Sequence, residues 1–271
     1  MKHLIALDLD GTTLNKKGDI TPKTKQVIDR LKEQGHIIVL ATGRPLSGAY
    51  QKYLDLELTT PIITDNGGSI ENPKDHTFPK QKNYIPLEMM HTIFKFCQPF
   101  IITAFFSIDE MTYAYQYDPK LEAFFSGINA EKVVEGPHTD FIHEATGLVY
   151  IIRHDAMETF ESYVKDHYGN ILSTRLWGVE DGQAVYEIYL KHISKSSGIQ
   201  RVLDFYQMNL TDVIAFGDGV NDVEMIRDAH HGVAMLNAVD EVKKVCKTIT
   251  AHDHDHDGVA NYLIDYFNLS M

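Results

Sequence analysis

Cysteine is scarce in this sequence. Among 271 residues only Cys97 and Cys246 are cysteines, and they lie far apart in the chain. Two such isolated residues form none of the closely spaced pairs that bind zinc or exchange a disulfide. We therefore expect no cysteine-based metal or redox site, and two buried apolar side chains in a protein of a reducing compartment.

Long hydrophobic runs and a basic excess are also absent. No apolar stretch approaches the roughly 18 residues that cross a bilayer, and Met1-Lys2-His3 leads into a short strand instead of a secretory signal. A formal net charge of −13 opposes binding to another polyanion such as nucleic acid. The expected protein is cytoplasmic, with neither membrane nor nucleic-acid partners.

The remaining composition is that of a globular protein. Hydrophobic residues make up 44% and charged residues 23% of the chain, and 271 residues are enough for one large domain or two ordinary ones. The only biased segment is a short His/Asp tract at residues 252–257.

The most informative stretch lies near the N-terminus. The apolar run at residues 4–7 predicts a buried strand, and Asp8 and Asp10 follow it before Gly11 ends the extended segment. Side chains two residues apart in an extended chain point to the same face. Both carboxylates are therefore expected in one crevice at the carboxyl end of the strand. Two anions this close require a cation or a shared proton, which indicates a divalent metal site.

Two plainer interpretations exist for this stretch. Asp-x-Asp-Gly alone is equally compatible with a polar turn. A calcium-binding loop with Asp8 at its first position is excluded by three features. Thr13 stands where that loop needs glycine, Asp19 stands where it needs glutamate, and no helix precedes it. Partners from elsewhere in the chain must therefore decide whether a metal site exists.

Strands and helices alternate through much of the chain. Thr21 and Pro22 favour a helix start, because a hydroxyl can cap the helix and proline suits its first position. Another helix is expected to begin at Lys195. The expected buried strands lie at residues 4–9, 36–41, 61–64, 212–216 and 232–235. This alternation predicts βαβ units and an α/β fold with a Rossmann-like parallel-sheet core.

The pattern changes between residues 82 and 186. This segment has several strand-like runs in hairpin-like succession with a few helices, the first beginning near Pro86. Such a succession predicts an α+β domain with an antiparallel sheet. We therefore expect an inserted domain at residues 82–186, and a core domain formed by residues 1–81 and 187–271.

Polar residues that could carry chemistry gather at the junctions of the predicted core. The four groups are Asp8 with Asp10, Thr42, Lys195, and Gly217-Asp218-Gly219-Val220-Asn221-Asp222. Each has a plain interpretation by itself: Thr42 and Asp222 as helix caps, Asp218 as a turn residue, and Lys195 as a solvated surface charge. Because the carboxyl ends of parallel strands meet at one edge of a sheet, we expect all four groups to lie together.

Two nucleotide-binding motifs are excluded. Gly217-x-Gly219-x-x-Asp222 has an aspartate where the dinucleotide fingerprint needs its third glycine. No Gly-x-x-x-x-Gly-Lys-Ser/Thr sequence occurs, which excludes a P-loop nucleotide hydrolase.

Together the four groups resemble the motifs of the haloacid dehalogenase superfamily of phosphatases. The stretches that carry the resemblance are Asp8-Leu9-Asp10-Gly11-Thr12, Thr42-Gly43-Arg44, Lys195, and Gly217 to Asp222. The insertion between the second and third motifs is similar to the α+β cap of the Cof-type subfamily. The stretches Gly232-Val233-Ala234-Met235 and Asp257-Gly258-Val259-Ala260 are similar to that subfamily too. Thr13 and Leu236 depart from the usual pattern, and neither is expected to touch phosphate.

The resemblance implies a role for each motif residue. Asp8 is the implied nucleophile, forming an aspartyl-phosphate, and Asp10 the implied general acid and base. The implied Mg²⁺ ligands are Asp8, the backbone carbonyl of Asp10, and Asp218. The implied phosphate-binding groups are Thr42, Lys195, Asn221 and backbone amides near Leu9 and Gly43. Asp222 is expected to position Lys195 or a metal-bound water, and Arg44 to steer substrate or pair with a surface acid.

Elementary chemistry agrees with these roles. An anionic nucleophile cannot approach an anionic phosphate without a cation between them, and Mg²⁺ prefers carboxylate ligands. A second acid facing the same crevice can serve both half-reactions of a covalent mechanism. Asp10 also argues against dehalogenation, because a halide leaving group needs no acid.

The expected function is Mg²⁺-dependent hydrolysis of small phosphorylated metabolites, sugar phosphates among them. One alternative is a phosphomutase of the same superfamily, which returns the phosphoryl group to substrate. Another is a phosphate-sensing or phosphoacceptor regulatory protein with a long-lived aspartyl-phosphate. Asp10 disfavours this last function, because it supplies the base for rapid dephosphorylation.

Three further features have open interpretations. The His/Asp tract at residues 252–257 is favoured as a solvated polar loop over a Zn²⁺ or Ni²⁺ chelator. Asn66 either forms a turn with Gly67 or faces the inserted domain. The aromatic residues of the insertion are expected mostly in its core, with a specificity pocket as the alternative. These residues include Tyr113, Tyr115, Tyr117, Phe124, Phe125 and Trp177.

Overall fold

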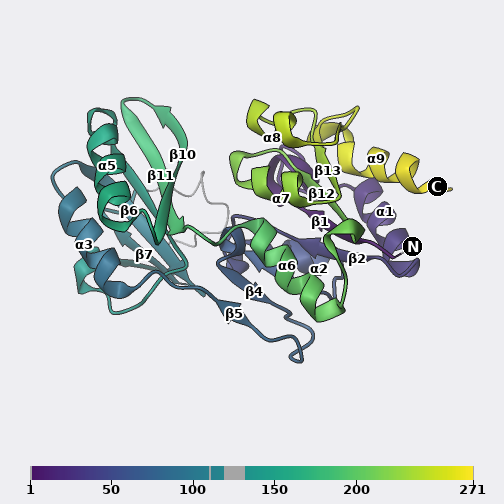
Figure 1. Ribbon diagram of the computed structural model, residues 1–271, viewed down its shortest axis with the longest axis horizontal. Coiled ribbons are helices and arrows are strands. Elements are labelled where there is room, and N and C mark those ends of the chain that lie inside the picture. Colours follow the sequence, from purple (N-terminus) through teal and green to yellow (C-terminus); the bar gives the residue numbers. More distant parts are fainter. Residues whose placement is uncertain (1, 110, 119–131, 271) are drawn as a thin grey trace. The chain divides into compact units, whose positions relative to one another are not determined.

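The computed structural model describes residues 2–109, 111–118 and 132–270, and the chain forms two compact units (Figure 1). The first unit consists of Met1–Gly43, Ala49–Gln81 and Ser194–Met271. The second consists of Arg44–Gly48 and Lys82–Ile193. The inserted domain that the sequence predicts at residues 82–186 falls within the second unit, and its bounds stay a prediction.

The first unit is built on a five-stranded parallel sheet. In sheet order its strands are β14 (Thr248–Ile249), β13 (His231–Ala234), β12 (Val213–Gly217), β1 (Leu4–Leu7) and β2 (Ile37–Leu40). Every residue of β1, β2 and β12 is buried, as expected when helices cover both faces of a parallel sheet. The predicted parallel core is therefore confirmed.

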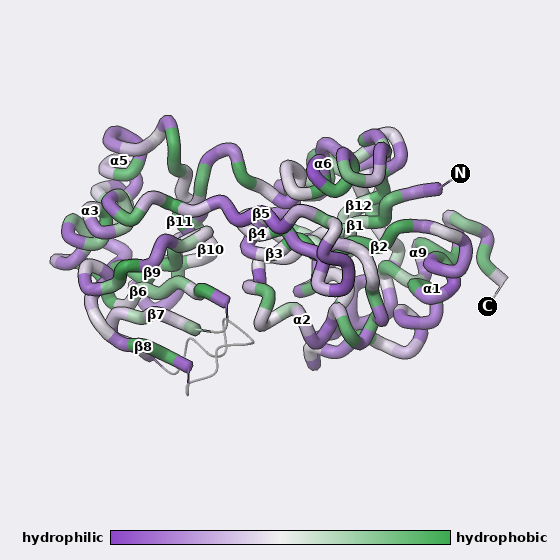
Figure 2. Tube along the Cα trace, turned by 90° about the horizontal axis from the view of Figure 1, so that it is seen from below, coloured by the Kyte–Doolittle hydropathy of each residue, from purple (hydrophilic) through white to green (hydrophobic). Residues whose placement is uncertain are grey.

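Helices pack on both sides of this sheet. Helices α1 (Pro22–Glu33) and α9 (Gly258–Phe267) lie on one side, and α6 (Lys195–Tyr206) lies on the other (Figure 2). The predicted start of α1 is confirmed, since Thr21 accepts a hydrogen bond from the backbone N–H of Thr24. Further helices are α2 (Leu46–Asp55), which belongs to this unit from Ala49 onward, α7 (Val223–Asp228) and α8 (Asp240–Val245).

A small three-stranded sheet adjoins the parallel one. It contains β3 (Ile62–Thr64), β4 (Ser69–Glu71) and β5 (Gln81–Lys82). A parallel bridge joins Ala41, the residue after β2, to Ile63 on β3. The third predicted strand thus lies next to the second, although the short partners β4 and β5 carry no pattern that predicts them.

The second unit has a six-stranded sheet with its long helices on one side (Figure 1). In sheet order the strands are β10 (Leu172–Glu180), β11 (Gln183–Leu190), β9 (Gly147–Arg153), β6 (Ile101–Ile108), β7 (Met111–Tyr115) and β8 (Val133–Glu135). The helices are α3 (Leu87–Cys97) and α5 (Met157–Tyr168). The predicted α+β class is confirmed.

One pairing differs from the predicted antiparallel sheet. Strands β7 and β8 run parallel, while the other neighbours in this sheet are antiparallel. Parallel neighbours need a crossover of a dozen or more residues, and the connection over residues 116–132 has that length. Hairpin spacing alone could not reveal this pairing.

The aromatic residues of the insertion divide between core and surface. Tyr113 and Tyr115 pack against the main apolar core of the unit, and Tyr117 packs against a smaller cluster. Trp177 is 38% exposed. Phe124 and Phe125 lie outside the described residues.

The cysteines differ in burial. Cys97 lies in the core of the second unit, as predicted, whereas Cys246 is only half-buried. No helix in the described ranges combines the length and apolar character needed to cross a bilayer.

Candidate active site

Asp8 is the first residue beyond β1, and the sheet holds it at the carboxyl edge. Its backbone N–H donates to the carbonyl of Phe216 on β12, at 3.1 Å. The hydroxyl of Thr13 donates to the carbonyl of Asp8, at 2.5 Å. These two hydrogen bonds fix the backbone of Asp8, and the residue is only 5% exposed. Thr13, which departs from the family pattern, therefore supports the backbone of this loop.

Lys195 pairs with two carboxylates. Its Nζ lies 2.6 Å from Asp8 Oδ1 and 2.6 Å from Asp222 Oδ1. Ser194 caps helix α6, so Lys195 occupies the first helical position, where it is fully buried. Burial alone would lower the pKa of Lys195, but Asp222 and Asp8 more than offset it and the pKa is raised. The interpretation as a solvated surface charge is wrong.

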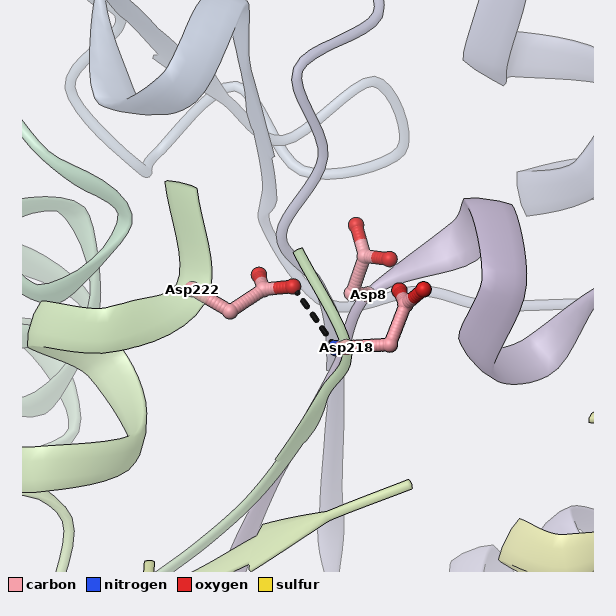
Figure 3. Close-up of side chains that lie close together, drawn as sticks. All are labelled: Asp8, Asp218 and Asp222. Carbon is pink, nitrogen blue, oxygen red and sulfur yellow. Dashed lines mark hydrogen bonds between the residues drawn. The ribbon is translucent and has the colours of Figure 1, made fainter. Parts of the chain in front are cut away.

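Asp222 uses both carboxylate oxygens within the protein. While Oδ1 accepts from Lys195, Oδ2 accepts from the backbone N–H groups of Asp218 and Gly219, at 2.9 and 3.0 Å. Figure 3 shows the bond to Asp218. Asp222 thus folds the loop that follows β12 and fixes the position of the lysine.

Asp218 completes a group of three acidic side chains. Carboxylate oxygens of Asp8, Asp218 and Asp222 lie within 4.8 Å of one another (Figure 3). Burial raises the pKa of Asp8 well above its usual value, with Lys195 opposing. Burial and then the charge of Asp222 raise the pKa of Asp218 to about 7. Three carboxylates facing one ammonium leave excess negative charge, and these residues therefore fit a bound divalent cation.

Gly11 allows the first loop to approach Asp218. Its φ is +70°, and an added Cβ would lie 2.2 Å from Asp218 Oδ2. An L-residue would be strained in this conformation and would displace the carboxylate as well. Thr12 strengthens the approach, since its hydroxyl donates to Asp218 Oδ1 at 3.1 Å.

Asp10 lies on the same loop, with an exposed side chain. Its negative charge contributes to the raised pKa of Asp218, so it lies near the acidic group. The side chain of Asp8, in contrast to that of Asp10, is buried. The two aspartates of the first motif therefore have different surroundings, as distinct chemical roles require.

The second motif reaches the same edge. The N–H of Ala41 donates to the carbonyl of Leu7, and the buried Thr42 follows Ala41 directly. An added Cβ on Gly43 would lie 3.1 Å from Asn66 Oδ1 and 3.4 Å from Asn221 Nδ2. Gly43, which follows Thr42, and Asn221 are thus brought together beside Asn66.

Asn66 is a neighbour of the site, whereas the sequence predicted either a turn residue or one that faces the inserted domain. It has a left-handed φ of 54°, is 3% exposed, and accepts a hydrogen bond from Asn221 Nδ2 at 2.9 Å. Its position after β3, at the edge where the other junctions meet, is the signal that could have indicated this role.

Arg44 is assigned to the second unit, where its guanidinium donates to the carbonyl of Gly48 at 3.1 Å. Its predicted supporting role stays a prediction.

The aspartates of the His/Asp tract hold a loop together. Asp253 accepts from the ring and backbone of His256, Asp255 pairs with Lys16 at 2.6 Å, and Asp257 accepts from the hydroxyl of Thr21. Among the residues that the structure describes, the acidic group around Asp8 is the one cluster suited to a metal ion. The tract has the contacts of a polar structural loop.

Comparison with known proteins identifies the family. Residues 5–263 match the family model described as haloacid dehalogenase-like hydrolase. The chain is 32% identical over 270 residues to the 5-amino-6-(5-phospho-D-ribitylamino)uracil phosphatase YitU of Bacillus subtilis (strain 168), covering 98% of each chain.

Solved structures agree. A haloacid dehalogenase-like hydrolase from Bacteroides thetaiotaomicron has a TM-score of 0.81 at 28% identity, with 98% of this chain and 100% of that chain covered. A putative HAD/COF-like hydrolase from Plasmodium vivax shares the fold, with a TM-score of 0.81 at 19% identity, 99% of this chain and 96% of that chain covered. The chain therefore belongs to the haloacid dehalogenase-like hydrolases, as a phosphatase with an inserted α+β domain.

Proposed function

We propose that this protein is a Mg²⁺-dependent phosphatase that hydrolyses small phosphate monoesters through an aspartyl-phosphate on Asp8. One observation carries the proposal. A buried aspartate at the carboxyl edge of a parallel sheet lies 2.6 Å from a buried lysine and within 4.8 Å of a second loop aspartate, Asp218. This arrangement concentrates a nucleophile and positive charge where an incoming phosphate needs both.

The first half-reaction transfers the phosphoryl group to the protein. Lys195 holds Asp8 Oδ1, while Oδ2 accepts no hydrogen bond from the described part of the chain. A carboxylate oxygen of Asp8 attacks phosphorus and the ester P–O bond breaks. The bonding electrons go to the departing alkoxide, which takes the proton from Asp10.

The second half-reaction restores the protein. Water attacks the phosphorus of the aspartyl-phosphate and gives its proton to Asp10, and the bond between phosphorus and Asp8 breaks. The products are inorganic phosphate, the free carboxylate of Asp8 and the protonated Asp10 with which the cycle began. The exposed position of Asp10 supports this role, because both the leaving alkoxide and water must reach it.

The phosphate oxygens would be held by side chains around Asp8. We assign this role to Lys195, Thr42 and Asn221, assisted by the backbone amides of Leu9 and Gly43. Lys195 has a third N–H besides those used by Asp8 and Asp222. The hydrogen bond to Asn66 supports Asn221 in this role by limiting the rotation of its amide.

Asp8, Asp218 and the backbone carbonyl of Asp10 would hold Mg²⁺. When bound, the ion supplies positive charge that lowers the repulsion between the carboxylate nucleophile and the phosphate. The two carboxylate oxygens of Asp222 accept hydrogen bonds from Lys195 and from the backbone N–H groups of Asp218 and Gly219. We assign it the positioning of Lys195.

The substrate class we propose is phosphorylated sugars and polyols of metabolite size. Support comes from the relative YitU, whose name describes a phosphatase acting on a phosphoribityl compound. The net charge of −13 supports a small substrate over a polyanionic one.

The test is a panel of phosphate esters with Mg²⁺ or chelator. Free phosphate is expected only with metal, and Asp8→Asn should abolish its release because an amide is a poor nucleophile. Asp204→Asn, at an exposed position near the other end of α6, is the matched control and should keep the parent rate.

Each of the two alternative functions predicts a different product. Isomerised sugar phosphate without free phosphate would show a phosphomutase. A stable phosphoprotein without turnover would show a phosphoacceptor regulator. Phosphate release by Asp8→Asn at the parent rate would refute the nucleophile assignment.

A further inference from the structure

Asn237 joins three segments beside the acidic group. Its Nδ2 donates to the carbonyl of Gly11 at 2.8 Å and reaches Asp218 Oδ2 at 3.4 Å. Its Oδ1 accepts from the backbone N–H of His254 at 3.1 Å. One amide therefore connects the loop after β1, the loop after β12 and the His/Asp tract.

The orientation of this amide is determined by its partners. A backbone N–H can only donate, so the atom facing His254 must be the oxygen. A backbone carbonyl can only accept, so the atom facing Gly11 must be the nitrogen. The side chain therefore presents N–H groups to Gly11 and Asp218.

The segment that carries Asn237 is itself held by backbone bonds. The N–H of Met235 donates to the carbonyl of Gly217 at 3.0 Å, and the N–H of Val239 donates to the carbonyl of Asp218 at 2.9 Å. The N–H of Leu236 donates to the hydroxyl of Thr250 at 2.9 Å. An asparagine on a segment anchored this closely can transmit the position of the tract to the metal-binding loop.

We propose that Asn237 is a positioning residue for the metal site, and that the His/Asp tract at residues 252–257 acts through it. Asn237 holds the carboxylate of Asp218 and the carbonyl of Gly11, next to Asp10, in the relative position that a bound cation needs. Groups that orient metal ligands contribute about 10- to 100-fold to metal affinity in other proteins. This inference rests on the proposed Mg²⁺ site.

Asn261, on helix α9 directly after the tract, provides a matched control. Its Nδ2 donates to the carbonyl of His256 at 2.9 Å, and its Oδ1 accepts from Lys23 at 2.5 Å. Asn261 thus anchors the far end of the tract through partners other than Asp218 and Gly11. Loss of general anchoring should affect both variants, whereas loss of ligand positioning should affect only Asn237.

The experiment is calorimetric titration of the full-length protein with Mg²⁺ in the absence of substrate. Asn237→Ala is expected to raise the Kd for Mg²⁺ by about 10-fold or more, and Asn261→Ala to leave it unchanged. The Mg²⁺ concentration for half-maximal phosphate release should rise in parallel, with kcat at saturating Mg²⁺ reduced much less. If Asn237→Ala fails to fold, Asn237→Ser serves instead, because serine is too short to reach both partners.

The outcomes separate the two proposals. If the parent protein binds Mg²⁺ and turns over, but Asn237→Ala binds Mg²⁺ as the parent does or is weakened no more than Asn261→Ala, this inference is overturned alone. If the parent protein binds no Mg²⁺, the proposed metal site and this inference fall together.

Discussion

Lys195 shows at the scale of one residue how the site depends on charge compensation. Lysine is almost never fully buried unless it is paired, and here it is 0% exposed between Asp8 and Asp222. The pairing satisfies the ammonium and neutralises part of the charge of two buried carboxylates. Removing the lysine would leave both carboxylates buried without their counter-charge.

Lys195→Met should therefore cost stability as well as activity. Removing one partner of a buried ion pair destabilises a protein by about 3–5 kcal/mol, and methionine keeps most of the side-chain volume. Denaturant unfolding measures the loss. Lys17→Met, at an exposed lysine, is the control and should change the free energy of unfolding by less than about 0.5 kcal/mol. Equal values for the two variants would contradict the pairing.

At the scale of elements, the second unit contains a histidine inside its aromatic core. His138 is 0% exposed and stacks on Phe94, with ring centroids 5.0 Å apart. Phe106, Phe141 and Tyr150 also surround it. Burial lowers the pKa of His138 from 6.5 to about 4, so the folded unit requires a neutral ring.

Acidification should therefore destabilise the second unit. Because the folded-state pKa lies below the ordinary one, this stabilisation is complete above pH 6.5 and is lost as the pH falls towards 4. The loss from this group is about 3 kcal/mol at the acid end. The fluorescence of Trp177, the only tryptophan, reports unfolding of this unit.

His138→Phe should flatten that pH dependence, because phenylalanine has no proton to gain. His154→Gln, at an exposed histidine, should keep the slope of the parent protein. An unchanged slope in His138→Phe would show that other groups control the acid unfolding.

At the scale of the whole molecule, the candidate active-site residues lie in one unit and the inserted α+β domain forms the other. Asp8, Asp10, Thr42, Lys195, Asn221 and Asp218 all belong to the first unit. A ligand of this site should therefore stabilise the first unit directly.

Mg²⁺ should protect the first unit selectively. At 100 times its Kd, a ligand that binds only the folded state adds about 2.7 kcal/mol of stability. Hydrogen exchange should slow around β1 and β12 when Mg²⁺ is added, and Asp218→Asn should abolish the effect. Equal protection of the strands in the second unit would contradict a site confined to the first.

Local patterns in the sequence were sufficient for the framework. Fully apolar runs in β1, β2 and β12 predicted a sheet buried on both faces, and the polar residues after them were expected at one edge because parallel strands end together. The alternation of strands and helices, and its interruption near residue 82, follow from composition along the chain. None of these inferences needs a distance between remote residues.

Tertiary structure decided how those residues pair. Lys195 bonds to Asp8 across 187 positions, and Asn221 bonds to Asn66 across 155. Lysine or asparagine alone carries no pattern that selects such partners, since the choice depends on which loops the folded sheet brings within hydrogen-bond distance. The same is true of Asn237 and of the parallel β7–β8 pair. The sequence by itself placed the four motif groups at one sheet edge, because parallel strands end together. Only the folded chain decided which atoms pair and that Asn66 and Asn237 join them.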